Sequence, residues 1–463
     1  MQIPQLIGTI GFFAAFTGTT LTAAPEPWRL HEEPGLPDWL LLNGSTRVRY
    51  EALDGQFRSG YDGGDQQLAA RTLIEGQVKF EHWSLVAELL DSRQALSDEG
   101  SPIDTSMVDT TDWLQAYLQL SADDLLQEGS SPELRLGRQT MDLGSRRLVA
   151  RNQFRNTLNA FDGAALYWNA EAGPDFRLFY FMPVVRRPSA ADELLDNHWQ
   201  ADRSYDDYQF WGLHSTWESF LVAKAQFEAY FYGLNEGDRG DLTTKDRHLY
   251  TPGIRLSRKP SKGAWDFDAE LAAQFGEQHN STKVSDTLEP DHWAQFAHLE
   301  CGYTYDVAWA PRIALLFDYA SGDEDPNDGK SNRFDTLFGA RRFDYGPTGI
   351  FGSFARSNIV SPGLGLKAKL TTKLQALLTY RAYWLASDTD AWTVSGLRDT
   401  TGQTDSFIGQ QVEVAMKREI LPGNLSADIG LAHLFAGSFT HDAPNASGQG
   451  DSTYGYVSLT FEF

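Results

Sequence analysis

Six arginines in the first third of the sequence have the clearest capacity for binding chemistry. They fall within 21 residues, and they are Arg135, Arg138, Arg146, Arg147, Arg151 and Arg155. A guanidinium group stays charged at neutral pH, and its planar set of N–H donors matches a carboxylate in a two-point contact. The segment therefore predicts a surface that binds organic anions. Residues 142–159 read as a loop, and we expect a loop so rich in Arg and Asn to fold into a pore.

Other cations alternate with apolar residues, which is typical of a strand with one polar face. Val48 and Tyr50 share one face, so Arg47 and Arg49 share the other. The same test assigns further cations to the polar face: Arg71, Arg177, Arg255, Arg312, Lys367, Lys369 and Arg381. We expect the apolar face to meet lipid, because an Arg facing lipid at mid-bilayer costs ~2–4 kcal/mol. Arg135 and Arg138 differ in parity, so one of them requires a bulge or a strand end.

The elements that carry these side chains are strands, because the alternation recurs along the whole chain. It predicts 18 strands, at 40–51, 66–81, 84–95, 112–121, 133–141, 160–169, 175–186, 208–217, 221–233, 247–258, 263–275, 292–304, 311–320, 358–370, 373–385, 406–418, 423–435 and 450–463. Connections between them are alternately long and short, with 122–132 as a longer exception among the short ones. Short periplasmic turns and long extracellular loops are the known asymmetry of bacterial outer-membrane barrels.

The last strand carries the strongest single signal. Residues 450–463 alternate strictly between apolar and polar side chains and end on Phe463, which is typical of the final strand of such barrels. The sequence therefore predicts an all-β fold, a single transmembrane antiparallel β-barrel of about 18 strands. A barrel of this strand number leaves an aqueous channel.

The N-terminus predicts secretion. An uncharged apolar run over 6–16 precedes the small residues Thr22 to Ala24 and then Pro25. We expect a signal peptide over 1–24, a periplasmic lead-in over 25–39 and the barrel over 40–463, placed in the bacterial outer membrane. Later apolar runs are shorter than the ~20 residues that a membrane helix requires.

A net charge of −24 without a basic block argues against nucleic-acid binding, and the lone Cys301 excludes an internal disulfide.

Four separated blocks resemble the alginate export family of outer-membrane channels. They are RVRYE at Arg47–Glu51, the GRQ…RRLV…RN…FDG block over Gly137–Gly163, Ser321–Phe338 and Leu431–Phe439. The resemblance spans essentially the whole mature chain, and it implies an 18-stranded barrel with an arginine-rich constriction that passes a polyuronate in the founding member. The matching positions are Arg47, Arg49, Arg138, Arg147, Arg151, Arg155, Asn156, Asp162, Asp323, Asp328 and Arg333. Many relatives have no link to alginate, so the family leaves the substrate open.

These features together predict a passive channel, without enzymatic activity or a cofactor, for an acidic polysaccharide such as alginate or a related organic anion. The expected lumenal binding residues are Arg47, Arg49, Arg71, Arg138, Arg147, Arg151, Arg155, Asn156, Asp162, Arg312, Arg333 and Arg381. The expected partners are the anion and outer-membrane lipid, with periplasmic export machinery as a further candidate. We expect the barrel to be monomeric.

Two alternatives stay open on the sequence alone. Inward arginines can pair with inward acids such as Glu75, Glu88, Asp318 and Glu413, which would give the neutral or plugged lumen of a structural barrel. A barrel hydrolase is the other alternative, although the chain has no G-x-S-x-G motif.

The acidic loop at 321–329 is a weak calcium candidate through Asp323, Asp325, Asn327 and Asp328. Its spacing departs from the EF-hand pattern, because Gly329 is not at the sixth position and the twelfth lacks Glu. We therefore expect a solvated loop and assign no metal site.

Overall fold

The computed structural model describes residues 27–463 except 33–34, 99, 126, 172, 240 and 326–327. The predicted signal peptide and Asn327 lie outside the described residues. No helix in the described ranges is long and apolar enough to cross a membrane.

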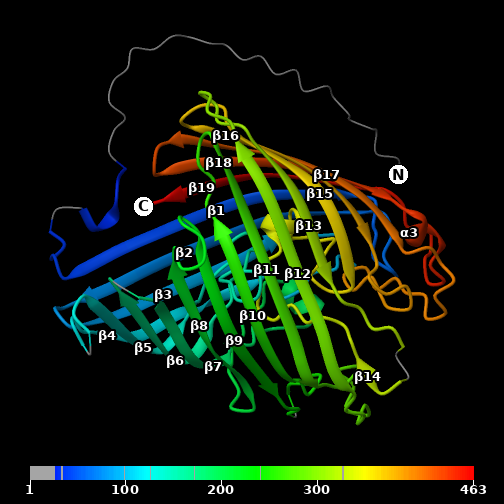
Figure 1. The fold of residues 1–463 in the computed structure, drawn as a ribbon, viewed down its shortest axis with the longest axis horizontal. Helices are drawn as coiled ribbons and strands as arrows, with labels where there is room; N and C mark the ends of the chain where they lie inside the picture. Colours follow the sequence, from blue (N-terminus) through cyan, green and yellow to red (C-terminus); the bar gives the residue numbers. More distant parts are fainter. Residues whose placement is uncertain are drawn as a thin grey trace.

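A closed antiparallel sheet of 18 strands forms the wall (Figure 1), as the alternation predicts. Strand β1 pairs with both β2 and β19, which closes the sheet into a barrel. The strands are β1 Leu40–Asp54, β2 Gly64–Lys79, β3 Trp83–Ala95, β4 Asp109–Ser121, β5 Ser130–Gln139, β6 Phe161–Ala170, β7 Asp175–Pro183, β8 Tyr208–Glu218, β9 Gln226–Glu236, β10 His248–Arg258, β11 Ala264–Glu277, β12 Asp291–Thr304, β13 Arg312–Ala320, β15 Ile359–Lys369, β16 Leu374–Trp384, β17 Phe407–Leu421, β18 Leu425–Ala436 and β19 Ser452–Glu462. The additional β14, Lys330–Ser331, pairs in parallel with β12 and belongs to a loop. Four short helices are also present: η1 Leu30–Glu32, α1 Ala191–Leu195, α2 Arg342–Tyr345 and α3 Ser438–Asp442.

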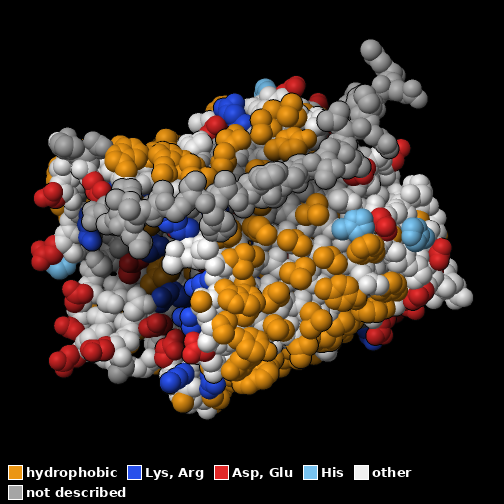
Figure 2. Space-filling model, turned by 90° about the horizontal axis from the view of Figure 1, so that it is seen from above, with side chains coloured by type: hydrophobic (Ala, Val, Ile, Leu, Met, Phe, Trp, Pro, Cys, Tyr) orange, Lys and Arg blue, Asp and Glu red, His pale blue; other side chains and the backbone are white. Residues whose placement is uncertain are grey.

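The two faces of the wall follow the alternation in the sequence. On β1, Val48 and Tyr50 are exposed, whereas Arg47 and Arg49 are buried inside the barrel. On the face seen in Figure 2, the outward apolar side chains form a broad hydrophobic surface. Because β1 also pairs with β19, the sheet of described wall strands has no free edge. The outward apolar surface is the one that lipid covers.

The two ends of the barrel differ. Connections at one end, here called the short-turn end, span 80–82, 122–129, 171–174, 219–225, 259–263, 305–311, 370–373 and 422–424. The other end, here called the long-loop end, carries loops 55–63, 96–108, 140–160, 184–207, 237–247, 278–290, 321–358, 385–406 and 437–451. The start of β1 and the C-terminus lie at the short-turn end, at the left of Figure 1. There, Trp28 of the lead-in stacks on Phe461, and Asn424 hydrogen-bonds to its backbone.

Two of the long loops, 140–160 and 321–358, fold into the barrel and meet each other. The backbone N–H of Phe338 donates to Leu148 O at 2.9 Å, and that of Ala150 donates to Phe338 O at 3.2 Å. Apolar residues of both loops, including Leu148, Val149 and Phe351, belong to the main buried cluster. The core therefore lies in the lumen, and the expectation that the arginine-rich loop folds inward is confirmed.

The register of β5 and β6 depends on two opposed glycines. Gly137 faces Gly163 across the ladder, and both have positive φ angles of 130° and 155°. A Cβ at Gly137 would lie 2.3 Å from the carbonyl oxygen of Ala116, so a larger residue would push neighbouring strands apart.

The predicted connection 122–132 is shorter than expected, because β5 begins at Ser130.

The outward apolar surface makes a depth-dependent prediction. Leu271, in the middle of β11, is 51% exposed, so Leu271→Arg places a charge in lipid and is expected to destabilise the barrel by ~2–4 kcal/mol. Val307→Arg, in the turn 305–311, is the control and should change stability by only ~0–1 kcal/mol. Urea titration of folding into lipid vesicles measures both. Equal effects of the two substitutions would contradict the assignment of the lipid face.

Candidate functional site in the lumen

The middle of the lumen is held by a buried ion-pair network around Arg147. Its guanidinium lies 3.2 Å from Asp268, 2.8 Å from Glu270 and 3.1 Å from Asp344. Arg356, fully buried, also pairs with Asp344. Burial alone would raise the pKa of Asp344, but the charges of Arg147 and Arg356 outweigh it and hold this pKa well below its usual range. The network joins the two inward loops to β11.

The same network extends along the barrel wall. Arg255 on β10 pairs with Asp268 at 2.7 Å and with Glu228 on β9 at 2.9 Å. Farther along the same wall, Arg381 of β16 pairs with Asp318 of β13 at 2.7 Å, and His298 Nδ1 lies 2.8 Å from the same carboxylate. Charged groups on several strands are therefore neutralised where the lumen is filled.

Three predicted binding residues hold the 140–160 loop in place by donating to backbone carbonyl groups. Arg47 and Arg71 both donate to the carbonyl oxygens of Gln153 and Arg155, at 2.8–3.0 Å. The amide of Asn156 donates to the carbonyls of Ala70, Arg93 and Met107. Because these donors are used by the protein itself, we assign them to loop positioning.

Four other predicted arginines are neutralised individually. Arg49 pairs with Glu51 at 2.6 Å and also packs over the Phe154 ring. The remaining pairs are Arg151–Glu88 at 2.6 Å, Arg312–Glu300 at 2.6 Å and Arg333–Asp390 at 2.7 Å. Much of the predicted arginine set therefore stiffens the lumen, as the neutral alternative requires.

The structure corrects the expectation that Arg138 and Asp162 face the lumen. Arg138 has the parity of Leu136, which is 41% exposed, whereas Asp162 follows the fully buried, inward Phe161. The two side chains pair across β5 and β6 at 2.8 Å on the outer face. Arg135 has the opposite parity and stacks on the ring of Tyr167, 4.5 Å from its centroid.

A group of half-buried arginines at the long-loop end has no carboxylate within ion-pair distance among the described residues. Its members are Arg58, Arg155 and Arg341. Arg58 and Arg341 donate to the carbonyl oxygens of Phe351 and Phe354, and within the described ranges the Arg155 side chain has no bonded partner. Burial and the charges of Arg341 and Arg186 lower the pKa of Arg155 to about 9, so it remains protonated at neutral pH.

A second basic region, here called the lysine cavity, lies at the short-turn end. This cavity of about 570 Å³ is lined by Lys262, Lys367, Lys369 and Lys417. Arg312 and Arg342 also reach it, but both are paired, and Asp428 is the acid of its lining. Throughout the described part of the chain, no lysine lies within 4.0 Å of a carboxylate oxygen. Figure 2 shows Lys and Arg side chains gathered beside a hollow toward the left end.

Two more cavities lie along the lumen. One of about 490 Å³ opens among loops of the long-loop end and is lined by Arg186, Lys245 and Arg247, together with Glu236 and Asp335. The other, of about 510 Å³, lies along β7 to β13 and has a mixed lining of Arg255, Arg312 and several acids. Open space is therefore present on both sides of the paired middle.

The acidic loop at 321–329 uses its carboxylates internally. Asp323 accepts the backbone N–H of Asn332 at 3.2 Å, and Asp328 accepts that of Lys330 at 2.8 Å. Among the described residues, groups of three side chains that could hold a metal ion occur at two other places.

Sequence reasoning missed Arg58 and Arg341 as binding candidates, and it did not group the four lysines into one cavity. The available signals were the doublet Arg341-Arg342 inside a long loop and the spacing of Lys367 and Lys369 on one strand face. Neither signal says which cation finds a carboxylate, because the partners come from distant parts of the chain.

The fold and the lumen define a class, the outer-membrane β-barrel channels. The sequence profile of the alginate export family matches residues 38–451, and the chain belongs to this family. A search of curated proteins gave no match.

Solved outer-membrane structures share the fold at low identity. OpdK of Pseudomonas aeruginosa, crystallised with vanillate, is 12% identical, with 91% of this chain and 98% of that chain covered and a TM-score of 0.57. OccAB3 of Acinetobacter baumannii is 13% identical, with 92% and 99% covered and a TM-score of 0.59. A BenF-like porin of Pseudomonas fluorescens Pf-5 is 12% identical, with 91% and 99% covered and a TM-score of 0.58.

The central network makes a prediction about stability. Arg147→Ala leaves three carboxylates without their shared partner, two of them buried, and is expected to destabilise the protein by ~3–5 kcal/mol. Arg155→Ala, in the same loop but without an ion pair, serves as the control and should have a much smaller effect. Urea unfolding of the detergent-folded barrel gives both values. A similar loss for both variants would show that the network does not hold the loops.

Proposed function

We propose that the protein is a passive outer-membrane channel for organic anions, with an acidic polysaccharide such as alginate as the first candidate substrate. The observation that carries this proposal is the distribution of cations that have no ion-pair partner within 4.0 Å among the described residues. Arg58, Arg155 and Arg341 lie at the long-loop end, and the lysine cavity lies at the short-turn end. Between them, the lumenal charge is largely paired. We take the long-loop end as extracellular and the short-turn end as periplasmic.

This distribution suits a polymer that must enter and leave. The low-dielectric wall focuses the field of unpaired cations into the lumen, which raises the local concentration of anions. Several weak sites allow movement, whereas one strong site would trap the substrate. Arginine matches carboxylates in a two-point contact, and lysine offers a flexible point charge.

The structural neighbours add support for a carboxylate substrate. OpdK was crystallised with vanillate and OccK2 with glucuronate, and both ligands are carboxylates. At sequence identities of 12% and 11% to this chain, the two structures show a shared fold alone. Their ligands therefore guide only the choice of substrates to test. The signal peptide over 1–24, the monomeric state and a periplasmic export partner remain predictions.

A second candidate is a barrel whose lumen is closed by its inward loops. The observation that favours it is the density of ion pairs that join loops 140–160 and 321–358 to the wall. Conductance separates the two candidates, because a closed structural barrel passes no steady current.

The arginine group sets the first test. In planar bilayers we expect the native protein to be anion-selective. The triple variant Arg58→Gln, Arg155→Gln, Arg341→Gln should have an anion-to-cation permeability ratio about tenfold lower, which is at the lower end of field-focusing effects. The reversal potential in a salt gradient measures this ratio. Arg93→Gln is the matched control, since Arg93 is already paired with Asp91 at 2.9 Å. A cation-selective native channel, or an unchanged triple variant, would refute the proposal.

The lysine cavity sets the second test. A uronate oligosaccharide added at the short-turn side is expected to block the current, and Lys367→Gln, Lys369→Gln, Lys417→Gln should weaken this block about tenfold, or ~1.4 kcal/mol. Lys373→Gln is the control, because Lys373 lies in the turn 370–373 at the same end but outside the cavity lining. Equal block in the triple variant and the control would remove the lysine cavity from the pathway.

A further inference from the structure

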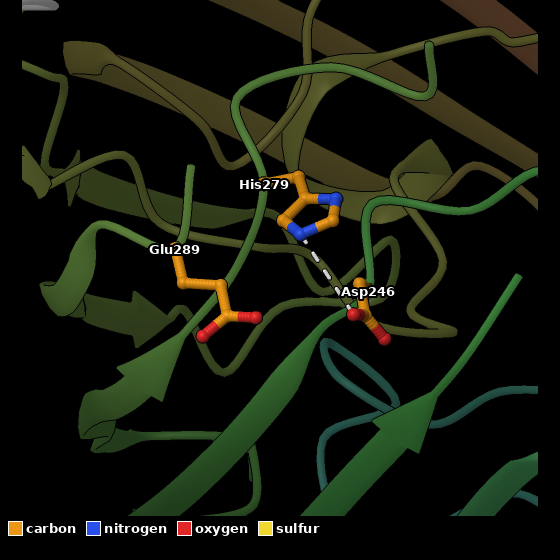
Figure 3. A group of neighbouring side chains, drawn as sticks. All are labelled: Asp246, His279 and Glu289. Atoms are coloured by element: carbon orange, nitrogen blue, oxygen red, sulfur yellow. Dashed lines mark ion pairs between the residues drawn. The ribbon is translucent and has the colours of Figure 1, made fainter. Parts of the chain in front are cut away.

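A cluster of metal-ligating side chains lies at the long-loop end, apart from the lumenal cations. Asp246, His279 and Glu289 bring one ligand atom each within 4.8 Å of one another (Figure 3). His248 approaches the same carboxylate from the other side. Oδ1 of Asp246 lies 3.7 Å from His248 Nε2, and Oδ2 lies 3.7 Å from His279 Nε2. One carboxylate therefore sits between two imidazoles.

The backbone brings these residues together from two loops. His279 is the second residue of the loop 278–290. Its N–H donates to Lys245 O in the loop 237–247 at 2.6 Å. His248 is the first residue of β10 and faces Glu277 of β11 in the ladder. The neighbouring carboxylate of Asp286 accepts a hydrogen bond from the Ser281 hydroxyl at 2.7 Å. The cluster is thus a junction between adjacent loops, placed by the pairing of β10 with β11.

The distances fit ligands around an ion better than direct bonds. A separation of 3.7 Å is too long for a hydrogen bond between imidazole and carboxylate. It is close to the ~3.3 Å between ligand atoms that surround one zinc ion tetrahedrally at ~2.0–2.1 Å. The side chains of His279, Asp246 and His248 are 12%, 32% and 43% exposed, so an ion reaches them from solvent.

Charge distinguishes this cluster from the other candidate group, His298, Asp318 and Asp344. There the carboxylates are occupied by Arg147, Arg356 and Arg381, and a metal ion would have to displace buried guanidiniums. At Asp246, the ion-pair partners within the described ranges are the two histidines. The carboxylate charge is therefore available to a cation.

We propose that Asp246, His279 and Glu289 bind a divalent transition-metal ion of the zinc type, with His248 beside the other oxygen of the Asp246 carboxylate. One imidazole nitrogen and two carboxylate oxygens suit such an ion, whereas calcium and magnesium prefer all-oxygen sites. The bound ion links loops 237–247 and 278–290. Thr244 and Lys245 of the first loop and Thr282 of the second line the 490 Å³ cavity at this end, so the ion fixes one rim of that opening.

Calorimetric titration of the full-length folded barrel with zinc chloride tests the site. We expect one saturable equivalent, its loss in His279→Ala, and a clear weakening in Glu289→Gln. His82→Ala, an exposed histidine at the short-turn end, is the control and should bind as the native protein does. Heat-dependent gel mobility checks that each variant is folded. Absence of saturable binding, or equal binding by folded His279→Ala, would overturn the proposal.

Proteolysis gives a second readout that is independent of transport. Lys283 is the single trypsin site in the loop 278–290. Zinc is expected to slow cleavage after Lys283 severalfold in the native protein and to leave His279→Ala unaffected, while calcium should protect neither. Protection by calcium alone, or equal cleavage with and without zinc, would contradict a transition-metal link between the loops.

Discussion

The structure depends on one electrostatic constraint, which is that charges buried inside a filled barrel must be neutralised. Loops 140–160 and 321–358 occupy the lumen and exclude water from its middle, where an isolated charge is strongly disfavoured. The arginine at position 147 satisfies this constraint for three carboxylates on β11 and α2. These ion pairs therefore hold the inward loops and the wall strands together.

The same constraint explains where binding capacity remains. Pairing is densest where the loops meet the wall, and unpaired cations occur where water enters from either end. This separates the overall charge of −24 from the local charge that a substrate meets. The lysine cavity has four lysines without carboxylate partners in the described residues, although the chain as a whole is acidic. An anionic partner and an acidic protein are compatible because the field in a narrow lumen is local.

Much of the fold could be predicted because each strand carries its own signal. Period-two alternation placed the strands and put Arg47 and Arg49 on the inner face, and connection lengths separated the two ends. Arg138 was misplaced although its parity conflict with Arg135 was visible, because alternation cannot show which of the two faces inward. The exposure of Leu136 and the burial of Phe161 in the closed sheet settle that question.

The sequence by itself determined the closed barrel, the inward direction of most arginines and the inward fold of the arginine-rich loop, because these follow from local side-chain patterns. The tertiary structure alone decided which cations are free. Arg147 finds Asp344 across 197 residues, whereas Arg155, eight residues later, finds no carboxylate among the described residues. The same holds for Asp246 and His279, which meet because β10 pairs with β11. Neutralisation depends on distances of a few ångströms between segments far apart in the chain, and a linear pattern does not contain those distances.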